Sequence, residues 1–474
     1  MSCVIFLIFV CSKVIILMHL PLARVRPIFK SGNKKNLDNY RPISILPIIN
    51  KIFERILSNR ITKFLETSDV ISQHQYGFMK GRDTQQAALH LIFDLINSVS
   101  SDGYCAGVFL DFSKAFQVLD RELLLFKLER YGIRGTLLTL LRSYLCDGRA
   151  DYVGVGDATS PKLPNNFGVP QGSILGPLMF LVYANDIVSL LKSNLTLLYA
   201  DDTTLRVKGR TRRLLMHRLA FTMDSVKDWA NYNLLKINLN KSKIMFFHKP
   251  SRQEEEFVGR ELGLGLAHKQ KFLGFVVDKK LSHAAHIKHL ISKLKKLKFV
   301  SYKISDFLTL SAAKSFYFGM VHSIILYGII IWGASNKSSD YKKLCRLHFK
   351  IVSYLFISHF DCNASYKFIL KRLNIMTIDD LYRMNALVAL YKVLNTNYLP
   401  SMQKFIANLA LKHSYNTRFR SNYRRPIPHI RSIKLNFVYN ALSFWNTLPI
   451  EIRSVGSVKS FKNKVCKFIF DEYN

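Results

Sequence analysis

The sequence predicts an α+β protein, because strand-like and helix-like patterns are mixed along it without a strict alternation of one strand and one helix. Its 474 residues are 49% hydrophobic, which is enough apolar material for a sizeable core and excludes a disordered or collagen-like chain. The charges are unbalanced, with 69 Lys and Arg against 32 Asp and Glu and a net charge of +37. This excess indicates a polyanionic partner, in the first place nucleic acid, with an acidic membrane surface as the alternative.

The first part of the chain predicts a hairpin followed by helices. Residues 24–45 are typical of a strand, a basic turn and a second strand. Residues 47–66 and 84–99 repeat their apolar side chains at helical spacing. A short apolar run at 107–110 then predicts a buried strand, and Asp111 follows at its end.

Further along, the pattern predicts three helices, at residues 120–130, 135–146 and 177–190. Pro177 suits the first position of the last one. Two apolar runs, 195–200 and 203–207, predict a tight hairpin with Asp201 and Asp202 at its turn.

The later part of the chain is basic and helical. Residues 286–303 keep apolar side chains at helical spacing, and lysines occupy the remaining faces, either as a solvated surface or as a track for phosphates. Residues 381–450 hold ten Lys and Arg and no Asp or Glu, so they cannot neutralise themselves through i,i+4 pairs and are expected to attract phosphate. His283, His286 and His289 recur every three residues, but no carboxylate or cysteine completes a metal site there.

Two apolar stretches bear on localisation. Residues 4–18 form an apolar leader whose meaning is open, since the run is short for a membrane span and no basic residues precede it. Residues 315–334 lack charged side chains, and a buried helix is the favoured interpretation over a membrane span. Seven scattered cysteines without a CxxC pair favour a reducing compartment, cytoplasmic or nuclear, with membrane association as the lesser alternative.

Asp111, Asp201 and Asp202 are the candidate catalytic residues. Carboxylates on neighbouring strand ends repel each other and raise each other's pKa, and a divalent cation removes this cost. Two Mg²⁺ ions roughly 3.5–4 Å apart can activate a hydroxyl and stabilise a leaving oxygen in phosphoryl transfer. Mg²⁺ favours a few carboxylates together with substrate phosphate oxygens, and Mn²⁺ is an alternative ion. A lone Asp-Asp pair would instead indicate a solvated turn.

Seven segments resemble the conserved boxes of reverse transcriptases, in the order and with the spacing of that family over residues 24–280. They are RPISIL at 41–46, QYGF at 75–78, LDFSKAF at 110–116, GVPQGSILGP at 168–177, YADDT at 199–203, NLNKSK at 238–243 and FLGF at 272–275. The amino-acid sequences of these segments are most similar to those of non-LTR retrotransposons of the jockey and CR1 type. Residues 327–333 and FWNTLP at 444–449 also resemble those elements.

The resemblance implies a right-hand polymerase with an apolar leader at 1–20, fingers and palm at 21–280, a helical thumb at 281–345 and a basic helical C-terminal domain at 346–474. It implies Mg²⁺-dependent addition of deoxynucleotides to a primer 3′-hydroxyl, templated by RNA. The expected partners are therefore an RNA template, a DNA primer or target and deoxynucleoside triphosphates. The sequence leaves the oligomeric state open.

The resemblance also implies roles for individual residues. Asp111 and Asp201 would be the main metal ligands, with Asp202 supporting them. Phe116 falls where the family places an aromatic gate against the ribose 2′-hydroxyl, and ordinary core packing is the alternative interpretation of this ring.

The remaining site residues are assigned to nucleotide binding: Lys30, Arg41, Gln171, Gly172 and Lys241. Gln171 and Gly172 lie in a loop that leads into a helix, where free backbone N–H groups can approach a nucleotide. Lys30 and Arg41 would reach the incoming triphosphate. Lys241 could donate a proton to the leaving pyrophosphate. Without the resemblance, Gly172 would be interpreted as a turn residue. Solvated surface charges are the alternative interpretation of Lys30, Arg41 and Lys241.

The sequence departs from the family pattern at two positions, since Gln117 stands where an Asp is usual and Arg121 where a His is usual. The chain also begins inside the expected fingers, without the usual endonuclease domain, which indicates an N-terminally truncated copy. A catalytically inactive remnant that only binds nucleic acid is therefore the alternative to an active polymerase.

Overall fold

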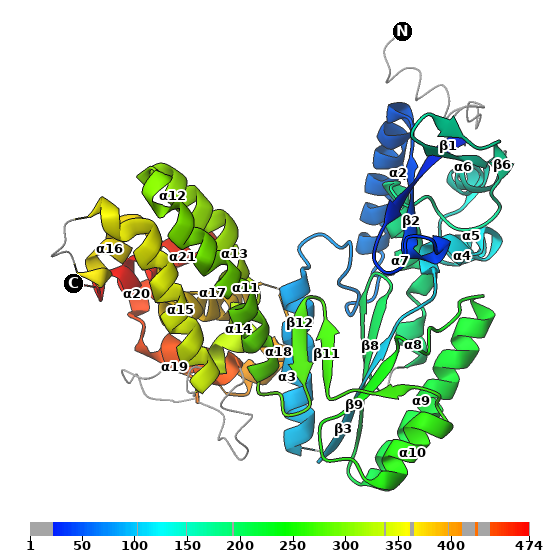
Figure 1. Cartoon of the computed structure of the whole chain (residues 1–474). Helices are drawn as coiled ribbons and strands as arrows, with labels where there is room; N and C mark the ends of the chain where they lie inside the picture. Colours follow the sequence, from blue (N-terminus) through cyan, green and yellow to red (C-terminus); the bar gives the residue numbers. More distant parts are fainter. Residues whose placement is uncertain are drawn as a thin grey trace.

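The computed structural model describes residues 22–101, 103–147, 149–191, 194–335, 338–360, 365–396, 398–409, 422–424 and 437–473. Two arms rise on either side of a central sheet, one formed by a smaller sheet with its helices and the other by helices alone (Figure 1). The mixed α/β class is thereby confirmed. The apolar run at 4–18 lies outside the described residues. Most of the residues between 409 and 437, which belong to the acid-free stretch 381–450, also lie outside them.

The first arm holds a five-stranded sheet in the order β2-β1-β4-β5, with β6 paired to β4. Its strands are β1 (Leu22–Phe29), β2 (Tyr40–Ile45), β4 (Ala150–Val155), β5 (Ala158–Thr159) and β6 (Leu163–Pro164). The predicted hairpin over residues 24–45 is confirmed, because β1 and β2 pair antiparallel, and a short 3-10 turn, η1 (Leu37–Asn39), precedes β2. The helices of this arm are α2 (Ile48–Thr67), α4 (Ala115–Val118), α5 (Arg121–Arg130), α6 (Gly135–Cys146) and α7 (Leu175–Ala184).

Most predicted helices of this part are confirmed within a few residues, but the helix expected at 177–190 is wrong. The segment forms α7 and a separate short helix, α8 (Ile187–Leu190), and Pro177 is the third residue of α7 instead of its first. The early start follows from distant partners, because the buried Glu54 carboxylate accepts the N–H groups of Ile174 and Leu175. The break follows from Asn185, whose side chain is engaged by the backbone of residues 70 and 72.

The central sheet has the order β10-β9-β3-β8-β7. Its strands are β3 (Tyr104–Leu110), β7 (Leu195–Tyr199), β8 (Asp202–Gly209), β9 (Lys243–Phe246) and β10 (Gly265–Leu266). The helix α9 (Arg212–Tyr232) contacts β8 and β3, while α3 (Thr84–Ser101) contacts β3 and β7.

Both faces of β3 are covered. Ala106 and Val108 belong to one hydrophobic core, whereas Cys105 and Phe109 belong to another. A strand buried on both faces reads as a continuous apolar run, which explains why the sequence signal at 107–110 was strong.

The second arm is helical and follows a two-stranded ribbon, β11 (Lys269–Phe272) and β12 (Phe275–Asp278). The longer helices are α11 (Ala284–Ile304), α15 (Ser339–Phe356), α16 (Tyr366–Leu373), α17 (Ile378–Asn395), α18 (Pro400–Ala407), α19 (Phe437–Thr447) and α21 (Val458–Asp471), with short turns at η2 (Ser305–Phe307), η5 (Ile357–His359) and α20 (Ile450–Arg453). This arm shares one hydrophobic core with α3, where the Phe93 and Phe405 rings meet at 5.3 Å.

The uncharged stretch at 315–334 is buried from Gly328 onward but exposes Phe318 and Met320 in its first part, and it is not the one buried helix that was predicted. It comprises α12 (Leu310–Phe316), a π-helical turn η3 (Tyr317–His322), α13 (Ser323–Leu326), α14 (Ile329–Trp332) and the 3-10 turn η4 (Gly333–Ser335). Gly328 interrupts it with a φ of 65°, and the Phe275 ring leaves no room there for a Cβ atom. Among the described residues no single helix meets the length and hydropathy needed to cross a bilayer; one pair bent by 51°, Leu310–Leu326 with Ile329–Ser335, does.

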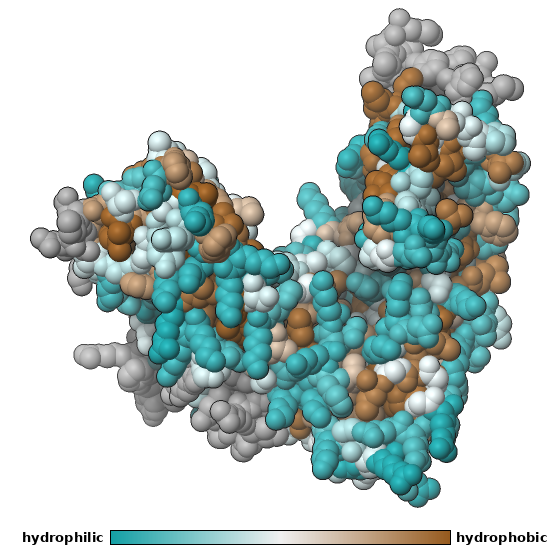
Figure 2. Space-filling view, viewed as in Figure 1, coloured by the Kyte–Doolittle hydropathy of each residue, from teal (hydrophilic) through white to brown (hydrophobic). Residues whose placement is uncertain are grey.

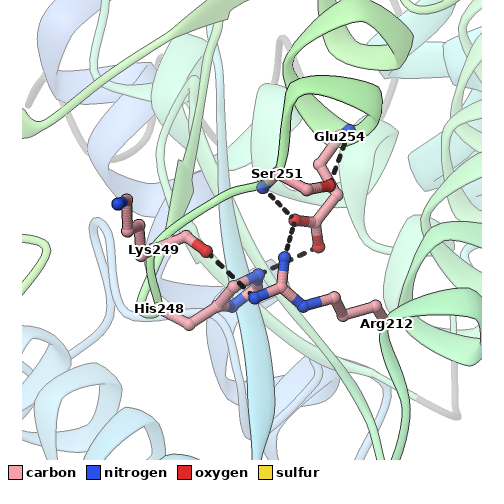
Figure 3. A network of polar contacts seen from close by, with 5 residues as sticks. All are labelled: Arg212, His248, Lys249, Ser251 and Glu254. Atoms are coloured by element: carbon pink, nitrogen blue, oxygen red, sulfur yellow. Dashed lines mark hydrogen bonds and ion pairs between the residues drawn. The ribbon is translucent and has the colours of Figure 1, made fainter.

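A polar network around the buried Glu254 ties the start of α9 to α10 (Arg252–Arg260) (Figure 3). The side chain of Glu254 is only 3% exposed. Its carboxylate accepts the Ser251 N–H at 2.6 Å and contacts Arg212 at 3.0 Å and His248 at 2.9 Å. The Glu254 N–H donates in turn to Ser251 Oγ, which completes a capping box.

We expect this network to make folding stability depend on pH. Burial raises the pKa of Glu254, but the hydrogen bonds from Ser251 and His248 outweigh burial, so its pKa lies below the usual value. A lowered folded-state pKa gives stability that is full above the ordinary value of about 4.3 and is lost as the pH falls through the folded value. Urea unfolding of Glu254→Gln against the parent chain should therefore show a deficit of about 1–3 kcal/mol near neutral pH that shrinks in acid. A deficit that is independent of pH would contradict this.

Candidate active site

Strand pairing places two of the candidate carboxylates side by side. In the antiparallel pair of β3 and β8, Leu110 lies opposite Thr203. The next position on each strand is Asp111 on one side and Asp202 on the other. Both residues line one cavity of about 220 Å³, together with Lys241 and Lys271. The pairing register of β3 and β8 thus brings together two carboxylates that are 91 residues apart in the sequence.

The third carboxylate lies in the adjacent turn. Tyr199 pairs with Asp202, so the turn between β7 and β8 consists of Ala200 and Asp201. The prediction that both aspartates occupy the turn is therefore corrected, because Asp202 is the first residue of β8. Ala200 has a φ of 56°, which a two-residue hairpin turn requires at its first position and which an L-residue adopts only at some cost.

A segment from another part of the chain supports this turn. The Tyr76 N–H donates to Leu198 O at 2.8 Å, and the Leu198 N–H donates to His74 O at 3.0 Å, so residues 74–76 run along β7 like a further strand. At Gly77 a Cβ atom would collide with the backbone N of Ala200 and would lie 2.9 Å from the carbonyl carbon of Tyr199. The QYGF segment was matched to the family by its letters, but this supporting role was missed.

Asp111 is held from the opposite side by the segment that leads into β9. Its N–H donates to Ser242 Oγ at 3.1 Å, and its carbonyl oxygen accepts the Asn238 N–H at 2.8 Å. Lys241 Nζ lies 3.5 Å from Asp111 Oδ2, and its side chain is 61% exposed. Lys241, predicted as a proton donor to pyrophosphate, is thus placed directly beside a candidate metal ligand.

The three carboxylates influence each other electrostatically. Asp202 is partly exposed, but the protein atoms around its carboxyl displace water, and this desolvation, together with Asp201 and Asp111, raises its pKa to about 6. Burial raises the pKa of Asp201 as well, a hydrogen bond from its own backbone opposes this, and Asp111 raises it further. Desolvation first, and the neighbouring negative charges after it, therefore disfavour the ionised forms of Asp201 and Asp202.

Whether the residues fit a divalent cation can be judged from these donors. Asp111 and Asp202 line the cavity, and Asp201 lies in the adjoining turn. Carboxylate oxygens are the ligands that Mg²⁺ uses together with substrate phosphates. Within the described residues, however, no group of three Asp, Glu, His or Cys side chains forms a ready-made metal cluster. The donor types fit the ion, and Asp111, Asp201 and Asp202 would hold it.

Replacing Asp202 with Asn should stabilise the metal-free protein at alkaline pH. A carboxyl whose folded pKa is raised contributes stability that is full below its ordinary value of about 3.9 and is lost as the pH rises through about 6. Asp202→Asn does not lose this stability as the pH rises. Its free energy of unfolding should therefore exceed that of the parent by an amount of the order of 1 kcal/mol near pH 8, a value reduced because the side chain is exposed to solvent. The difference should vanish near pH 4. Denaturant unfolding in a chelator measures it, and equal stability of the two proteins near pH 8 would contradict it.

Two of the residues predicted to bind the nucleotide act on the turn with Asp201, and two others pack against β2. Arg41 and Lys30 both lower the pKa of Asp201, which puts these exposed cations within electrostatic reach of the turn. The loop with Gln171 and Gly172 packs on β2, because Gln171 O accepts the Ser44 N–H at 2.7 Å. At Gly172, φ is 115° and a Cβ atom would lie 2.8 Å from Ser44 O.

Phe116 and Arg121 lie next to this loop. The Phe116 ring is half-buried and stacks at a tilt on Phe180, with the ring centroids 4.6 Å apart. Arg121, at a position where the family usually has His, is 3% exposed and donates to the carbonyl groups of Asn165, Phe167 and Gly168. It thereby fixes the approach to the GVPQG segment, a role that the sequence did not reveal.

Two of the three histidines that recur at residues 283, 286 and 289 pack into the protein interior. His283 and His286 are buried, and burial is the largest cause that lowers the pKa of each to about 4. Both are therefore neutral at physiological pH, while His289 is more exposed.

Comparisons with known proteins identify the family of the chain. The family model described as reverse transcriptase (RNA-dependent DNA polymerase) matches residues 32–277. The chain is 27% identical over 347 residues to the probable RNA-directed DNA polymerase from transposon X-element of Drosophila melanogaster, covering 71% of this chain and 38% of that protein. It is 28% identical over 330 residues to the RNA-directed DNA polymerase from mobile element jockey of the same organism, covering 67% and 36%.

Among solved structures, apo telomerase from Candida tropicalis is similar at 12% identity and a TM-score of 0.44, covering 82% of this chain and 69% of that one. The chain spans less than two fifths of the length of the two Drosophila relatives named above. The predicted resemblance to jockey-type non-LTR elements is confirmed. With more than half of its residues matched by the family model and its carboxylates on adjoining strands, the chain belongs to the reverse transcriptase (RNA-dependent DNA polymerase) family.

Proposed function

We propose that the chain is an RNA-directed DNA polymerase of a non-LTR retrotransposon, which adds deoxynucleotides to a primer 3′-hydroxyl on an RNA template. The observation that carries this proposal is the register of β3 and β8, which sets Asp111 beside Asp202 next to the turn with Asp201. Membership of the family supports it. Partners of the proposed reaction are an RNA template, a DNA primer or target and deoxynucleoside triphosphates, handled in the cytoplasm or nucleus.

The proposed reaction uses the residues around the turn. Asp111 and Asp201 would be the main ligands for two Mg²⁺ ions, or Mn²⁺, with Asp202 in support. When bound, such ions would supply activation of the hydroxyl and stabilisation of the leaving oxygen. Lys30 and Arg41 bind the triphosphate, whose charge they compensate, from the first arm. Lys241 holds a proton at Nζ beside Asp111 and can deliver it to the leaving pyrophosphate.

The proposed anatomy follows the two arms. Residues 21–280 would be fingers and palm, residues 281–345 a thumb, and residues 346–474 a C-terminal domain. A wide hollow separates the two arms above the central sheet (Figure 2), which suits a primer–template duplex. Phe116, Gln171 and Gly172 line the proposed nucleotide position from the first arm.

The proposal is tested by primer extension with the purified chain. Oligo(dT) annealed to poly(rA) is supplied with dTTP and Mg²⁺, and incorporation is followed on a gel. We expect extension that is abolished by a chelator and restored by Mg²⁺ or Mn²⁺. Tight binding of the hybrid without any incorporation would instead support the alternative, an element remnant that only binds nucleic acid.

A further inference from the structure

A basic groove lies between α11 and α15 on the helical arm. Its volume is about 800 Å³, and ten residues of these two helices line it. Lys288 approaches Asp340 at 3.8 Å near one end of the helix pair, and the Tyr302 and Tyr354 rings meet at 5.3 Å near the other. The two helices therefore run parallel and in register, and the groove follows their common direction.

The lining combines two kinds of side chain. Five are cationic: Lys295, Lys298, Lys343, Arg346 and Lys350. Three are aromatic: Phe299, Tyr302 and Tyr354. No Asp or Glu lines the groove, and Phe299 and Tyr302 are 64% and 57% exposed. Over α15 and α11, Figure 2 shows hydrophilic atoms bordering hydrophobic ones.

We propose that this groove binds a single-stranded segment of RNA, at a site separate from the carboxylates. Cationic side chains that follow a backbone, with exposed rings between them, are the combination by which proteins hold unpaired nucleic acid. A duplex keeps its bases stacked inside and offers no ring faces to Phe299 or Tyr302, so the aromatic lining favours an unpaired strand. None of the ten lining residues lines the cavity of Asp111 and Asp202.

The dimensions suit a short strand. From Ile291 to Tyr302 the groove extends over twelve residues of helix, which are roughly 16 Å long at a rise of 1.5 Å for each step from one residue to the next. At roughly 3.4 Å per phosphate this length accommodates about five stacked nucleotides. Five cations over that distance match one strand.

RNA is favoured over DNA for two reasons. The proposed function, on which this choice of strand rests, gives the chain an RNA template. Tyr302 and Tyr354, which line the groove, also carry phenolic hydroxyls, and a hydroxyl that both donates and accepts can serve the ribose 2′-hydroxyl. Asp340 contacts Lys343 at 3.8 Å and marks one end of the cationic strip.

Fluorescence anisotropy with a labelled oligo(rU) of about eight nucleotides tests the proposal on the full chain. Removing both exposed rings, Phe299→Ala with Tyr302→Ala, should raise Kd at least about tenfold, while the Kd for a blunt RNA–DNA hybrid stays within about twofold. Neutralising Lys298, Arg346 and Lys350 to Gln should also weaken binding and reduce the salt slope by about 2. The matched control changes Lys293, Lys296 and Lys342 to Gln, which lie on the same helices outside the groove, and should leave the affinity for oligo(rU) near that of the parent.

Several outcomes would overturn the proposal. They are unchanged oligo(rU) binding by the ring variant, equal losses in the groove and control triples, or oligo(dT) bound as tightly as oligo(rU). A polyglutamate peptide that competes with oligo(rU) and loses binding in the ring variant would make the groove a site for acidic protein. Primer extension on poly(rA)–oligo(dT) by the ring variant distinguishes failure of this proposal from failure of the proposed function. Loss of the groove should leave extension by the ring variant intact. If the proposed function is wrong, no variant should extend the primer.

Discussion

Replacing Asp111 or Asp201 with Asn is expected to lower primer extension at least about a thousandfold, because each change removes a charged metal ligand whose contribution to the transition state is several kcal/mol. Asn has nearly the shape of Asp, so the strand register and the turn should remain. The rate of single-nucleotide addition on poly(rA)–oligo(dT) at saturating dTTP is the measurement.

Asp224→Asn is the control for these two variants. Asp224 lies on α9 with its side chain 68% exposed, where it pairs only weakly with Lys227 at 3.5 Å. The Asp224→Asn variant loses the same charge at a position outside the site. We therefore expect its extension rate to match that of the parent. Normal activity of Asp111→Asn, alongside an active control, would exclude this residue as a ligand.

Gly77→Ala is expected to reduce extension about a hundredfold and to lower stability by about 1–3 kcal/mol. Its Cβ atom would press on the backbone of Tyr199 and Ala200, which cannot move aside as the end of a flexible side chain could. The turn that carries Asp201 would have to shift, and misplacement by about 1 Å is enough to cost two orders of magnitude in rate. Extension rates and urea unfolding should be measured together.

Gly259→Ala provides the comparison, because nothing lies within 4 Å of a Cβ atom at this position on α10. Alanine in a helix is favoured over glycine, so this variant should be as active as the parent and slightly more stable. If Gly77→Ala retained full activity, residues 74–78 would not position the turn.

The sequence predicted those parts of the fold that follow from local pattern. The strand before Asp111 was recognisable because burial on both faces leaves only apolar residues, and the long helices repeat their apolar positions. The carboxylates were found because short motifs carried them. That Asp111 adjoins Asp202 depends on strand order, which no local pattern contains.

The remaining features depend on contacts between distant segments. The helix expected at 177–190 starts early because Glu54, more than a hundred residues away, accepts its first N–H groups. Arg121 looked like a departure from the family, yet its guanidinium holds the backbone at 165–168. The groove between α11 and α15 could be recognised only once these helices were known to be parallel neighbours. A phosphate track was one of the two interpretations that the lysines of residues 286–303 left open.

The central claim is that Asp111, Asp201 and Asp202 converge on a common pair of divalent cations, and crystals of the chain soaked in Mn²⁺ test it most directly. Anomalous difference density locates the metal without reference to activity. We predict peaks about 2 Å from carboxylate oxygens of both Asp111 and Asp201, with Asp202 beside them, and no such peaks in Asp201→Asn. Well-ordered carboxylates without metal density between them at saturating Mn²⁺, or Mn²⁺ bound only elsewhere, would contradict the claim.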